Sequence, residues 1–308
     1  MPDGWQLRIA RFGPKKTALG TVLLCQGRAE YIEKYYPAIS RLTDQGYHVL
    51  TFDWRGQGGS GRLLPKQPRK GHIQSFESYE KDLEHIIKTV LLLRCPAPYT
   101  MMAHSTGAAI ALSNSLYGQT RFDRMILSAP LLALPALPCL DARHFPLVSH
   151  LFSGMGLSKA YVFFGGETLS GSGKFDGNSL TGSKRQYARM QAYMQDYPQL
   201  GLGSPTIGWV RACCRYLSRF DRPEFVGRLH VPTLFLLGTD EKIVSRQAID
   251  RVAFAMPCAE RLLLPGARHE LFMETEAIQD TLWTAIEAFL HPDLRHQNPS
   301  ALEESFEV

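Results

Sequence analysis

Ala103-His104-Ser105-Thr106-Gly107 is the stretch of the sequence that best indicates the fold. The residues before the serine, Tyr99 to His104, are typical of a strand, and those after it, Thr106 to Leu116, favour a helix. A chain that passes from strand to helix at one residue turns sharply and packs the strand end against the helix start. Small residues two positions either side of the serine allow that contact, as in the pattern Gly-x-Ser-x-Gly. Ala103 replaces the first glycine, so the match carries one extra methyl group.

Strands and helices alternate on both sides of this turn. From Trp5 to Pro130, strand patterns at Thr21–Cys25, Val49–Asp53, Tyr99–His104 and Arg124–Ser128 are separated by helical patterns that include Ile32–Asp44 and Phe76–Leu93. From Val231 onward the order is a strand (Thr233–Leu237), a helix (Arg246–Ala255), a strand (Arg261–Leu264) and a closing helix (Ile278–Leu290). Strands joined by helices predict an α/β fold with a parallel sheet and crossover connections.

The middle of the chain, Leu131 to Arg228, breaks this alternation. It contains Pro135, Pro138 and Pro146, a Gly/Ser-rich stretch from Gly165 to Gly182, and a helical, aromatic-bearing piece around Arg185–Tyr197. A floppy insertion is one interpretation, but the aromatic residues and the position after a core strand favour a cap over the carboxyl edge of the sheet. We therefore expect a core from residues 1–130 and 229–292, a cap from 131–228, and a C-terminal tail from 293–308.

Ser105 is a candidate nucleophile, and a serine at neutral pH needs a base that takes its proton and a third group that orients the base. His269 is the candidate base, because it follows the strand Arg261–Leu264 and a Pro265-Gly266 turn. This late loop falls at the carboxyl edge of the sheet, where the turn at Ser105 also lies. His104 is nearer in sequence, but its side chain leaves the turn in another direction. A surface histidine is the alternative interpretation of His269.

The acid of such a set should lie between the serine and the histidine in the chain. The strand Thr233–Leu237 ends in Gly238-Thr239-Asp240-Glu241-Lys242-Ile243-Val244, which offers two adjacent carboxylates. Either one could accept the Nδ1 hydrogen bond of His269 and fix its tautomer. Since neighbouring side chains diverge, only one can do so, and the other would be a turn or capping carboxylate.

Backbone N–H groups aimed at the developing oxyanion are also required, and they lower the barrier by a few kcal/mol. The amide of Thr106, the residue after the nucleophile, is one candidate. The turn Gln26-Gly27-Arg28-Ala29 after the first core strand offers the other, and we expect it to be the Arg28 amide. The glycine cluster in Asp53-Trp54-Arg55-Gly56-Gln57-Gly58 lacks the ending of a phosphate-binding loop, so a structural loop is the better interpretation.

Composition restricts the function classes further. Hydrophobic residues at 44% and charged residues at 20% are typical of a soluble globular protein, and no apolar run approaches a membrane span. The first twelve residues have a strand pattern rather than that of a signal peptide. Six cysteines show no zinc spacing, and we expect mostly buried free thiols of a reducing compartment. These features together predict a cytoplasmic protein.

The net charge of +5 is mild. It could favour peripheral contact with an anionic membrane surface, but a solvated basic surface is the better interpretation. No basic stripe is interleaved with aromatic residues, so the sequence gives no support for nucleic-acid binding. No cofactor or metal motif was found, and we expect a small-molecule substrate and no cofactor.

With these residues identified, the sequence resembles the α/β-hydrolases of the lysophospholipase L2 and monoacylglycerol lipase group, also described as serine aminopeptidase-like hydrolases. The resemblance covers about residues 5 to 290. The core motifs that carry it are Gly27-Arg28-Ala29-Glu30-Tyr31 with Lys34-Tyr35, Asp53-Trp54-Arg55-Gly56-Gln57-Gly58, Ala103-His104-Ser105-Thr106-Gly107 and Gly266-Ala267-Arg268-His269-Glu270. The cap motifs, which are the more specific part, are Asn178-Ser179-Leu180-Thr181, Arg185-Gln186-Tyr187, Gly203-Ser204-Pro205-Thr206 and Trp209-Val210.

The resemblance implies a mostly parallel central sheet flanked by helices, with a helical cap inserted after the sixth strand. It implies a serine esterase or lipase that cleaves lipid-like carboxylic esters through an acyl-enzyme on Ser105. The family's acid stands three residues beyond the strand-end glycine, which selects Glu241 over Asp240. Arg28 or Lys34 near the entrance could meet a lipid phosphate. A peptidase or small-ester hydrolase on the same scaffold, or a ligand-binding homologue without turnover, are the alternatives.

Overall fold

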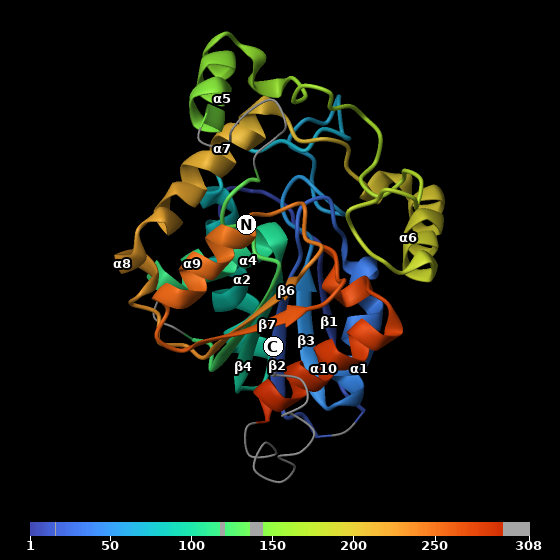
Figure 1. Ribbon diagram of the computed structural model, residues 1–308, viewed down its shortest axis with the longest axis vertical. Helices are drawn as coiled ribbons and strands as arrows, with labels where there is room; N and C mark the ends of the chain where they lie inside the picture. The colour runs from blue at the N-terminus through green and yellow to red at the C-terminus, as the bar shows by residue number, and fades with distance from the viewer. Residues whose placement is uncertain (16, 118–120, 136–143, 292–308) are drawn as a thin grey trace.

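A seven-stranded sheet forms the centre of the protein (Figure 1). The structure is a computed structural model that describes residues 1–15, 17–117, 121–135 and 144–291. The strands lie in the order β1-β3-β2-β4-β5-β6-β7; β1 pairs antiparallel with β3, and the other pairs are parallel. Their bounds are β1 Ile9–Phe12, β2 Gly20–Cys25, β3 Tyr47–Phe52, β4 Tyr99–His104, β5 Arg124–Ser128, β6 Thr233–Gly238 and β7 Ala259–Leu264.

Helices cover both faces of the sheet, which explains why its strands are continuous apolar runs. Every residue of β2 and β6 is buried. Apolar side chains of α1 (Tyr36–Asp44) and α10 (Glu276–Leu290) pack on one face, and those of α2 (Glu77–Ile86), α4 (Ser105–Tyr117) and α9 (Arg246–Ala255) pack on the other. The prediction of a mostly parallel sheet flanked by helices is confirmed.

Two predicted helices differ from the observed ones in their local geometry. Ile32–Asp44 begins as a 3₁₀ turn, η1 (Ile32–Tyr35), and continues as α1 with a proline in its first turn, where the missing N–H is tolerated. Phe76–Leu93 is divided into α2, a π-helical turn η2 (Ile87–Leu91) and α3 (Leu92–Arg94). The Thr89 hydroxyl donates to the His85 carbonyl oxygen within this region, in competition with the regular backbone bond.

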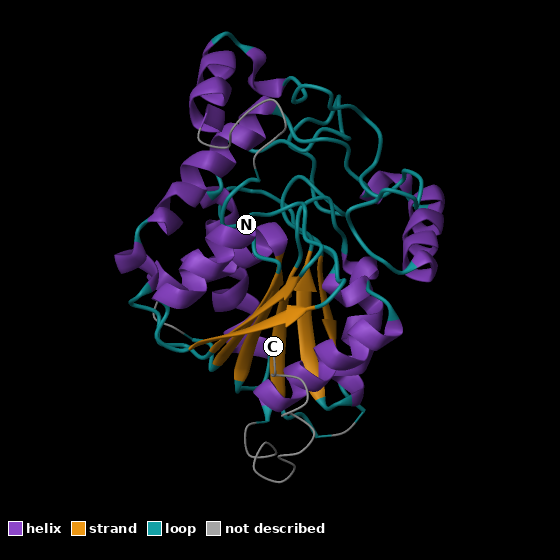
Figure 2. Ribbon diagram, viewed as in Figure 1, coloured by secondary structure: helices purple, strands orange, loops and turns teal. Residues whose placement is uncertain are grey.

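The segment between β5 and β6 contains α5 (Phe145–Gly154), α6 (Lys184–Asp196), α7 (Ile207–Leu217) and α8 (Pro223–Val226). Its helices and long loops lie largely around the end of the sheet at which the parallel strands finish (Figure 2). The expected place after a sixth strand is wrong within the described residues: the segment follows the fifth, because β1 is the single strand that precedes the parallel ones. The predicted tail, 293–308, and residues 136–143 of the predicted cap lie outside the described residues.

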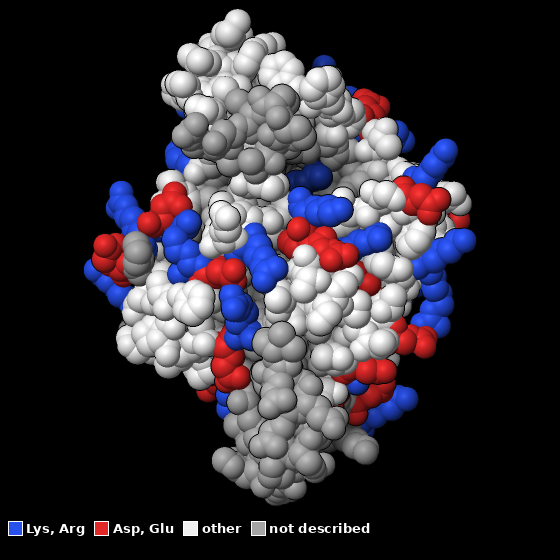
Figure 3. All heavy atoms as spheres, viewed as in Figure 1, with Lys and Arg blue, Asp and Glu red and all other residues white. Residues whose placement is uncertain are grey.

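The surface carries charges of both signs. On the face in Figure 3, Lys and Arg are interspersed with Asp and Glu across the middle, whereas the end near α5 carries few charged side chains. In the described part of the chain, no helix is both long enough and apolar enough to cross a membrane. The five described cysteines are free, as predicted, but only Cys25 and Cys213 are buried, since Cys258 is exposed and Cys95 and Cys214 are intermediate. The cytoplasmic location stays a prediction.

Candidate active site

The turn at Ser105 joins β4 directly to α4, as the pattern predicts. Ser105 has φ 50°, a left-handed conformation that is uncommon for residues other than glycine and marks a sharp turn. A Cβ on Gly107 would lie 2.2 Å from the Gln26 carbonyl oxygen, so this position requires glycine. Ala103 is fully buried and pairs in the sheet with Cys25 and Leu127, so the extra methyl group is accommodated.

Ser105, His269 and Glu241 form a continuous row of hydrogen bonds. His269 Nε2 lies 3.1 Å from Ser105 Oγ, and His269 Nδ1 lies 2.7 Å from Glu241 Oε2. The other carboxylate oxygen of Glu241 accepts the backbone N–H groups of Ile243 at 2.5 Å and Val244 at 3.1 Å. The carboxylate is therefore held from two sides, and its remaining acceptor faces the imidazole.

The two neighbouring carboxylates occupy different environments. Glu241 has a side chain that is 1% exposed, whereas Asp240 is exposed and accepts a hydrogen bond from the Thr239 hydroxyl at 3.3 Å. The backbone N–H of Asp240 donates to the Ala267 carbonyl oxygen, which fixes the turn after β6. The structure thus brings Glu241 to His269 and leaves the Asp240 side chain at the surface.

His269 and Glu241 each favour the charged form of the other. Burial alone would lower the pKa of His269, but the hydrogen bond and charge of Glu241 outweigh it, and the pKa is raised. For Glu241, burial would raise the pKa, but the hydrogen bond to His269 and its charge lower it below its usual value. An imidazole with a raised pKa accepts a proton readily, which is the property that a base for Ser105 needs.

The turn after β2 stands beside the serine. Ala29 in this turn has a left-handed φ of 62°, and its N–H donates to Gln57 Oε1 at 3.2 Å, while Gln57 Nε2 donates to the Gly27 carbonyl oxygen at 2.7 Å. The loop from Asp53 to Gly58 therefore shapes this turn, in agreement with its interpretation as a structural loop. The buried Asp53 carboxylate accepts the N–H of Ile32 and of Gly59.

A cavity of about 220 Å³ opens above the serine. Ser105, His269, Arg28 and Thr106 all line it, so both residues that were expected to supply backbone donors lie at the same cavity as Ser105. Its other walls are mostly apolar and include residues of the segment between β5 and β6: Leu131, Leu134, Leu180, Pro205 and Trp209. A larger depression, about 730 Å³, between the N-terminus and α2 contains none of the predicted site residues.

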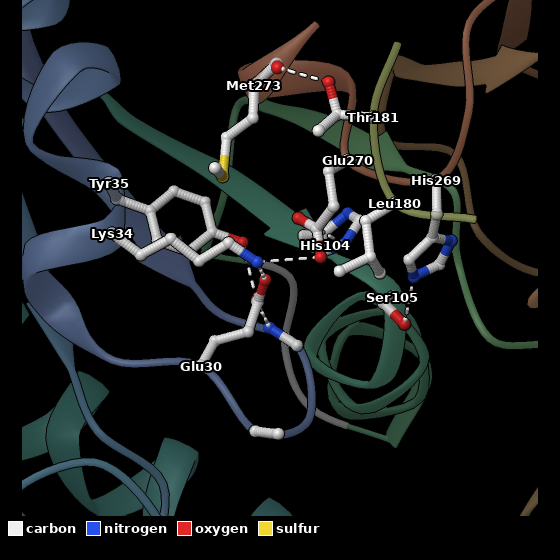
Figure 4. Close-up of polar contacts among 12 residues, drawn as sticks. Glu30, Lys34, Tyr35, His104, Ser105, Leu180, Thr181, His269, Glu270 and Met273 are labelled. Atoms are coloured by element: carbon white, nitrogen blue, oxygen red, sulfur yellow. Dashed lines mark hydrogen bonds and ion pairs between the residues drawn. The ribbon is translucent and has the colours of Figure 1, made fainter. Parts of the chain in front are cut away.

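Three buried polar residues of this cavity, Glu30, His104 and Glu270, were not predicted as site residues. The Lys34 ammonium pairs with Glu30 and with Glu270, and His104 lies beside Glu270 (Figure 4). Lys34 itself is not among the lining residues, because its ammonium group is turned toward Glu30 and Glu270. The structure therefore does not support the expectation that Lys34 meets a lipid phosphate, whereas Arg28 does line the cavity.

The chain is similar over most of its length to several known proteins. A family model described as serine aminopeptidase, S33 matches residues 16–276. Lysophospholipase L2 of Escherichia coli strain K12 is 30% identical over 91% of this chain and 82% of the relative. Probable lysophospholipase L2 of Haemophilus influenzae is 29% identical over 90% of this chain and 86% of the relative. In fold, the chain is similar to a soluble variant of monoglyceride lipase from Saccharomyces cerevisiae crystallised with a substrate analog, with a TM-score of 0.73, 20% identity, and coverage of 94% and 93%.

Proposed function

The chain belongs to the serine aminopeptidase S33 family of α/β-hydrolases, in the group of lysophospholipase L2 and monoglyceride lipase, and we propose that it cleaves its ester through an acyl-enzyme on Ser105. As a member of this group it is a carboxylic ester hydrolase of lipid-like substrates. The observation that carries the proposal is the row of hydrogen bonds from Ser105 through His269 to Glu241.

In the proposed reaction, His269 Nε2 takes the proton of Ser105 Oγ, which attacks the acyl carbon. The carbonyl oxygen becomes an oxyanion, and the backbone N–H groups of Arg28 and Thr106 donate to it. The ester C–O bond then breaks, and the leaving alcohol takes the proton from His269. A water molecule, deprotonated by His269, attacks the acyl-serine ester and releases the fatty acid. Glu241 keeps its charge throughout and stabilises the imidazolium.

Covalent labelling tests this proposal directly. A fluorophosphonate is expected to label the wild-type protein at Ser105, and Ser105→Ala is expected to abolish both labelling and ester hydrolysis. Assays in parallel with lysophospholipid, monoacylglycerol, short p-nitrophenyl esters and aminoacyl anilides separate a lipid esterase from a small-ester hydrolase or a peptidase. Labelling at another residue, or none, would contradict the proposed nucleophile.

We further propose that the substrate is a lysophospholipid and that the Arg28 guanidinium binds its phosphate. Arg28 lines the cavity of Ser105, donates to the Gly203 carbonyl oxygen at 3.0 Å, and lies 5.9 Å from the centre of the Trp209 ring. Among the described residues, no carboxylate pairs with it, although partly buried arginines such as Arg8 and Arg55 each contact two acids. Burial lowers the pKa of Arg28 from its ordinary value, so an anion would relieve this cost.

Arg28→Gln keeps the backbone N–H and removes the charge. Because a hydrogen bond to a charged group contributes about 1.5–3 kcal/mol, the ratio of kcat/KM for lysophospholipid over monoacylglycerol is expected to fall roughly 10- to 100-fold. Arg41→Gln on α1, where a half-exposed arginine pairs with Glu287, removes the same charge elsewhere and should leave the ratio unchanged. An equal ratio in Arg28→Gln and wild type would contradict the phosphate site.

The protein is also proposed to meet its substrate at a lipid surface. Five large apolar side chains are exposed here: Leu147, Leu151 and Met155 on or just after α5, and Phe163 and Phe164 farther along the chain. The ring centres of Phe163 and of Phe152 on α5 are 5.2 Å apart, so Phe163 lies next to this helix. Phe164 is fully exposed and has a left-handed φ of 62°, a conformation that bulky residues rarely adopt. We call Leu147, Leu151, Met155, Phe163 and Phe164 the apolar patch. Such patches mark interaction sites, and a lipid substrate resides in a membrane or micelle.

A further inference from the structure

Four ionisable side chains meet beside His269, and we call Glu30, Lys34, His104 and Glu270 the Lys34 cluster (Figure 4). The Lys34 Nζ atom lies 2.5 Å from Glu30 Oε1 and 2.7 Å from Glu270 Oε1, and its side chain is only 7% exposed. His104 Nε2 lies 3.5 Å from the other oxygen of Glu270. Buried charges of this kind are costly unless they are paired, and here one ammonium group serves two carboxylates.

The cluster connects the three segments that carry the proposed chemistry. Glu30 Oε2 accepts the backbone N–H of Gly27, which precedes Arg28 in the turn after β2, and the Tyr35 hydroxyl at 2.7 Å. His104 is the residue before Ser105, and its Nδ1 lies 3.2 Å from the Ser128 carbonyl oxygen. Glu270 is the residue after His269, and its N–H donates to the Leu180 carbonyl oxygen at 2.8 Å. Lys34 therefore links the oxyanion turn to the histidine loop through Glu30 and Glu270.

A metal ion is the alternative occupant of this position. Glu30, His104 and Glu270 offer ligand atoms that lie within 4.8 Å of one another. The Lys34 ammonium, however, already contacts both carboxylates, so the chain supplies its own cation at the place where a metal would bind. Burial would lower the pKa of Lys34, but the charges of Glu270 and Glu30 outweigh it and raise the pKa, so the ammonium stays charged.

The cluster also carries a net charge next to His269. Burial lowers the pKa of His104 to about 3, so His104 is neutral, and two carboxylates with one ammonium leave a charge of −1. The ring centres of His104 and His269 are 4.7 Å apart. The charged or titratable groups around His269 are thus Glu241 after β6, Glu270 on its own loop, Glu30 and Lys34 after β2, and His104 at the end of β4. After Glu241, the charges of Glu270 and Glu30 raise the pKa of His269 further.

We propose that Lys34 is a positioning residue: its ammonium holds Glu30 and Glu270 together, so that the oxyanion turn, Ser105 and His269 keep their relative places and Glu270 can stabilise the imidazolium. The inference rests on the proposed function of Ser105 and His269. It predicts an effect on the chemical step rather than on substrate binding, because the Lys34 side chain does not line the cavity.

The first test compares Lys34→Met with Lys34→Arg. The methionine variant is expected to lose about 10- to 100-fold in kcat with KM changed less than about twofold, since small displacements of reacting groups have effects of this size. The arginine variant restores a cation and is expected to recover most of kcat. Lys88→Met removes a lysine that pairs with Glu84 at the surface and serves as the control. Wild-type kcat in Lys34→Met, or an equal loss in both Lys34 variants, would overturn the proposal.

The second test does not depend on the Lys34 variants folding. Glu270→Gln removes one negative charge near His269 and keeps the shape of the side chain, so the acidic limb of the kcat/KM profile is expected to move to lower pH. Glu276→Gln, an exposed acid that pairs with Arg185, should leave the limb in place. An unmoved limb, or one shifted to higher pH, would contradict the electrostatic role of the cluster.

The proposed function and this inference fail in different ways. If fluorophosphonate does not label wild-type Ser105, the acyl-enzyme proposal fails, whatever the Lys34 variants do. If the wild type is labelled and Lys34→Met is labelled at the same rate, the catalytic serine stands and the positioning role of Lys34 is refuted. Thermal unfolding of each variant separates slow labelling of a folded protein from loss of fold. Chelator treatment should leave wild-type activity unchanged, and a loss would favour a metal over the internal cation.

Discussion

The identity of the acid depends on which of two neighbouring carboxylates faces His269. Glu241 extends to His269 Nδ1, whereas Asp240 points to solvent and its N–H fixes the turn. Glu241→Gln is expected to lower kcat by about 10³- to 10⁴-fold, because the imidazole loses the group that fixes its tautomer and stabilises its charge. Asp240→Asn should retain nearly all activity. The measurement is kcat with a p-nitrophenyl ester, and the reverse ranking of the two variants would assign the acid to Asp240.

The pH dependence follows from the same contact. A base must be neutral to act, so activity is lost as the pH falls through the raised pKa of His269. Because Glu241 raises this pKa, Glu241→Gln is expected to move the acidic limb of its residual activity to lower pH. The kcat/KM profile of the variant measures this shift. A limb at the wild-type pH would indicate that another group controls the ionisation.

The small residues around Ser105 are not equivalent. Gly107→Ala would bring a Cβ to 2.2 Å from the Gln26 carbonyl oxygen, so the turn must open, and both Tm and kcat should fall. Ala103→Gly restores the general pattern, yet it removes a buried methyl group and is expected to destabilise the strand by about 0.5–1 kcal/mol without a gain in kcat. Urea unfolding and ester hydrolysis test both variants. A more active Ala103→Gly would mean that the methyl group restrains the turn.

At the residue scale, the candidates that could be predicted were those with a local pattern. Ser105 was indicated by its small neighbours, and His269 by its place after a strand at the correct edge of the sheet. The pairing of Lys34 with Glu270 could not be predicted, because the two residues are far apart in sequence. A lysine close to glutamates in a helical pattern usually lies on the solvated face of the helix. Only folding brings the turn after β2 against the histidine loop.

At the scale of elements, the histidine loop is attached to the segment between β5 and β6 by a buried carboxylate. Glu274 accepts the N–H groups of Arg268 and Gly182, and the Thr181 hydroxyl donates to the Met273 carbonyl oxygen at 2.7 Å. Arg268 Nη1 in turn donates to the carbonyl oxygens of Asn178 and Thr181. The segment that lines the cavity is thus fixed to the loop that carries His269.

Glu274→Ala would leave these N–H groups without their acceptor. We expect a loss of about 1–3 kcal/mol in the free energy of unfolding, and faster proteolysis between β5 and β6 because that segment is released first. Urea unfolding and limited trypsin digestion measure the two effects. Asp280→Ala, which removes an exposed carboxylate farther along α10, is the control and should change neither. Equal stability of Glu274→Ala and wild type would mean that other contacts hold the segment.

The regular elements could be predicted because buried parallel strands and amphipathic helices have distinct periods. β4, β5 and α9 have the bounds expected from the sequence. The π turn η2 could not be predicted, because the apolar pattern of Phe76–Leu93 fits an ordinary α-helix equally well. The segment between β5 and β6 was expected after a sixth strand, since the sequence does not reveal how many strands precede the parallel ones.

At the scale of the whole molecule, the proposed function raises the question of how a lipid substrate would reach the cavity of Ser105. The apolar patch is on and next to α5, which packs against α7, and Trp209 of α7 lines the cavity. A molecule that rests on a lipid surface through this patch would take up its substrate without passing it through water. Transfer of exposed apolar side chains from water into the membrane interface is favourable and scales with the apolar area buried.

Leu147→Ser with Leu151→Ser, and separately Phe164→Ser, test this arrangement. Sedimentation with phosphatidylcholine vesicles is expected to show weaker binding of these variants and slower hydrolysis of vesicle-borne lysophospholipid. Hydrolysis of a short soluble ester should keep its wild-type kcat, because the patch residues do not line the cavity. Phe254→Ser removes another exposed aromatic residue, on α9, and should bind vesicles as the wild type does. Vesicle binding that is equal in the wild type and the patch variants would show that the protein meets its lipid in another way, because these variants remove the exposed apolar surface on which the proposal depends.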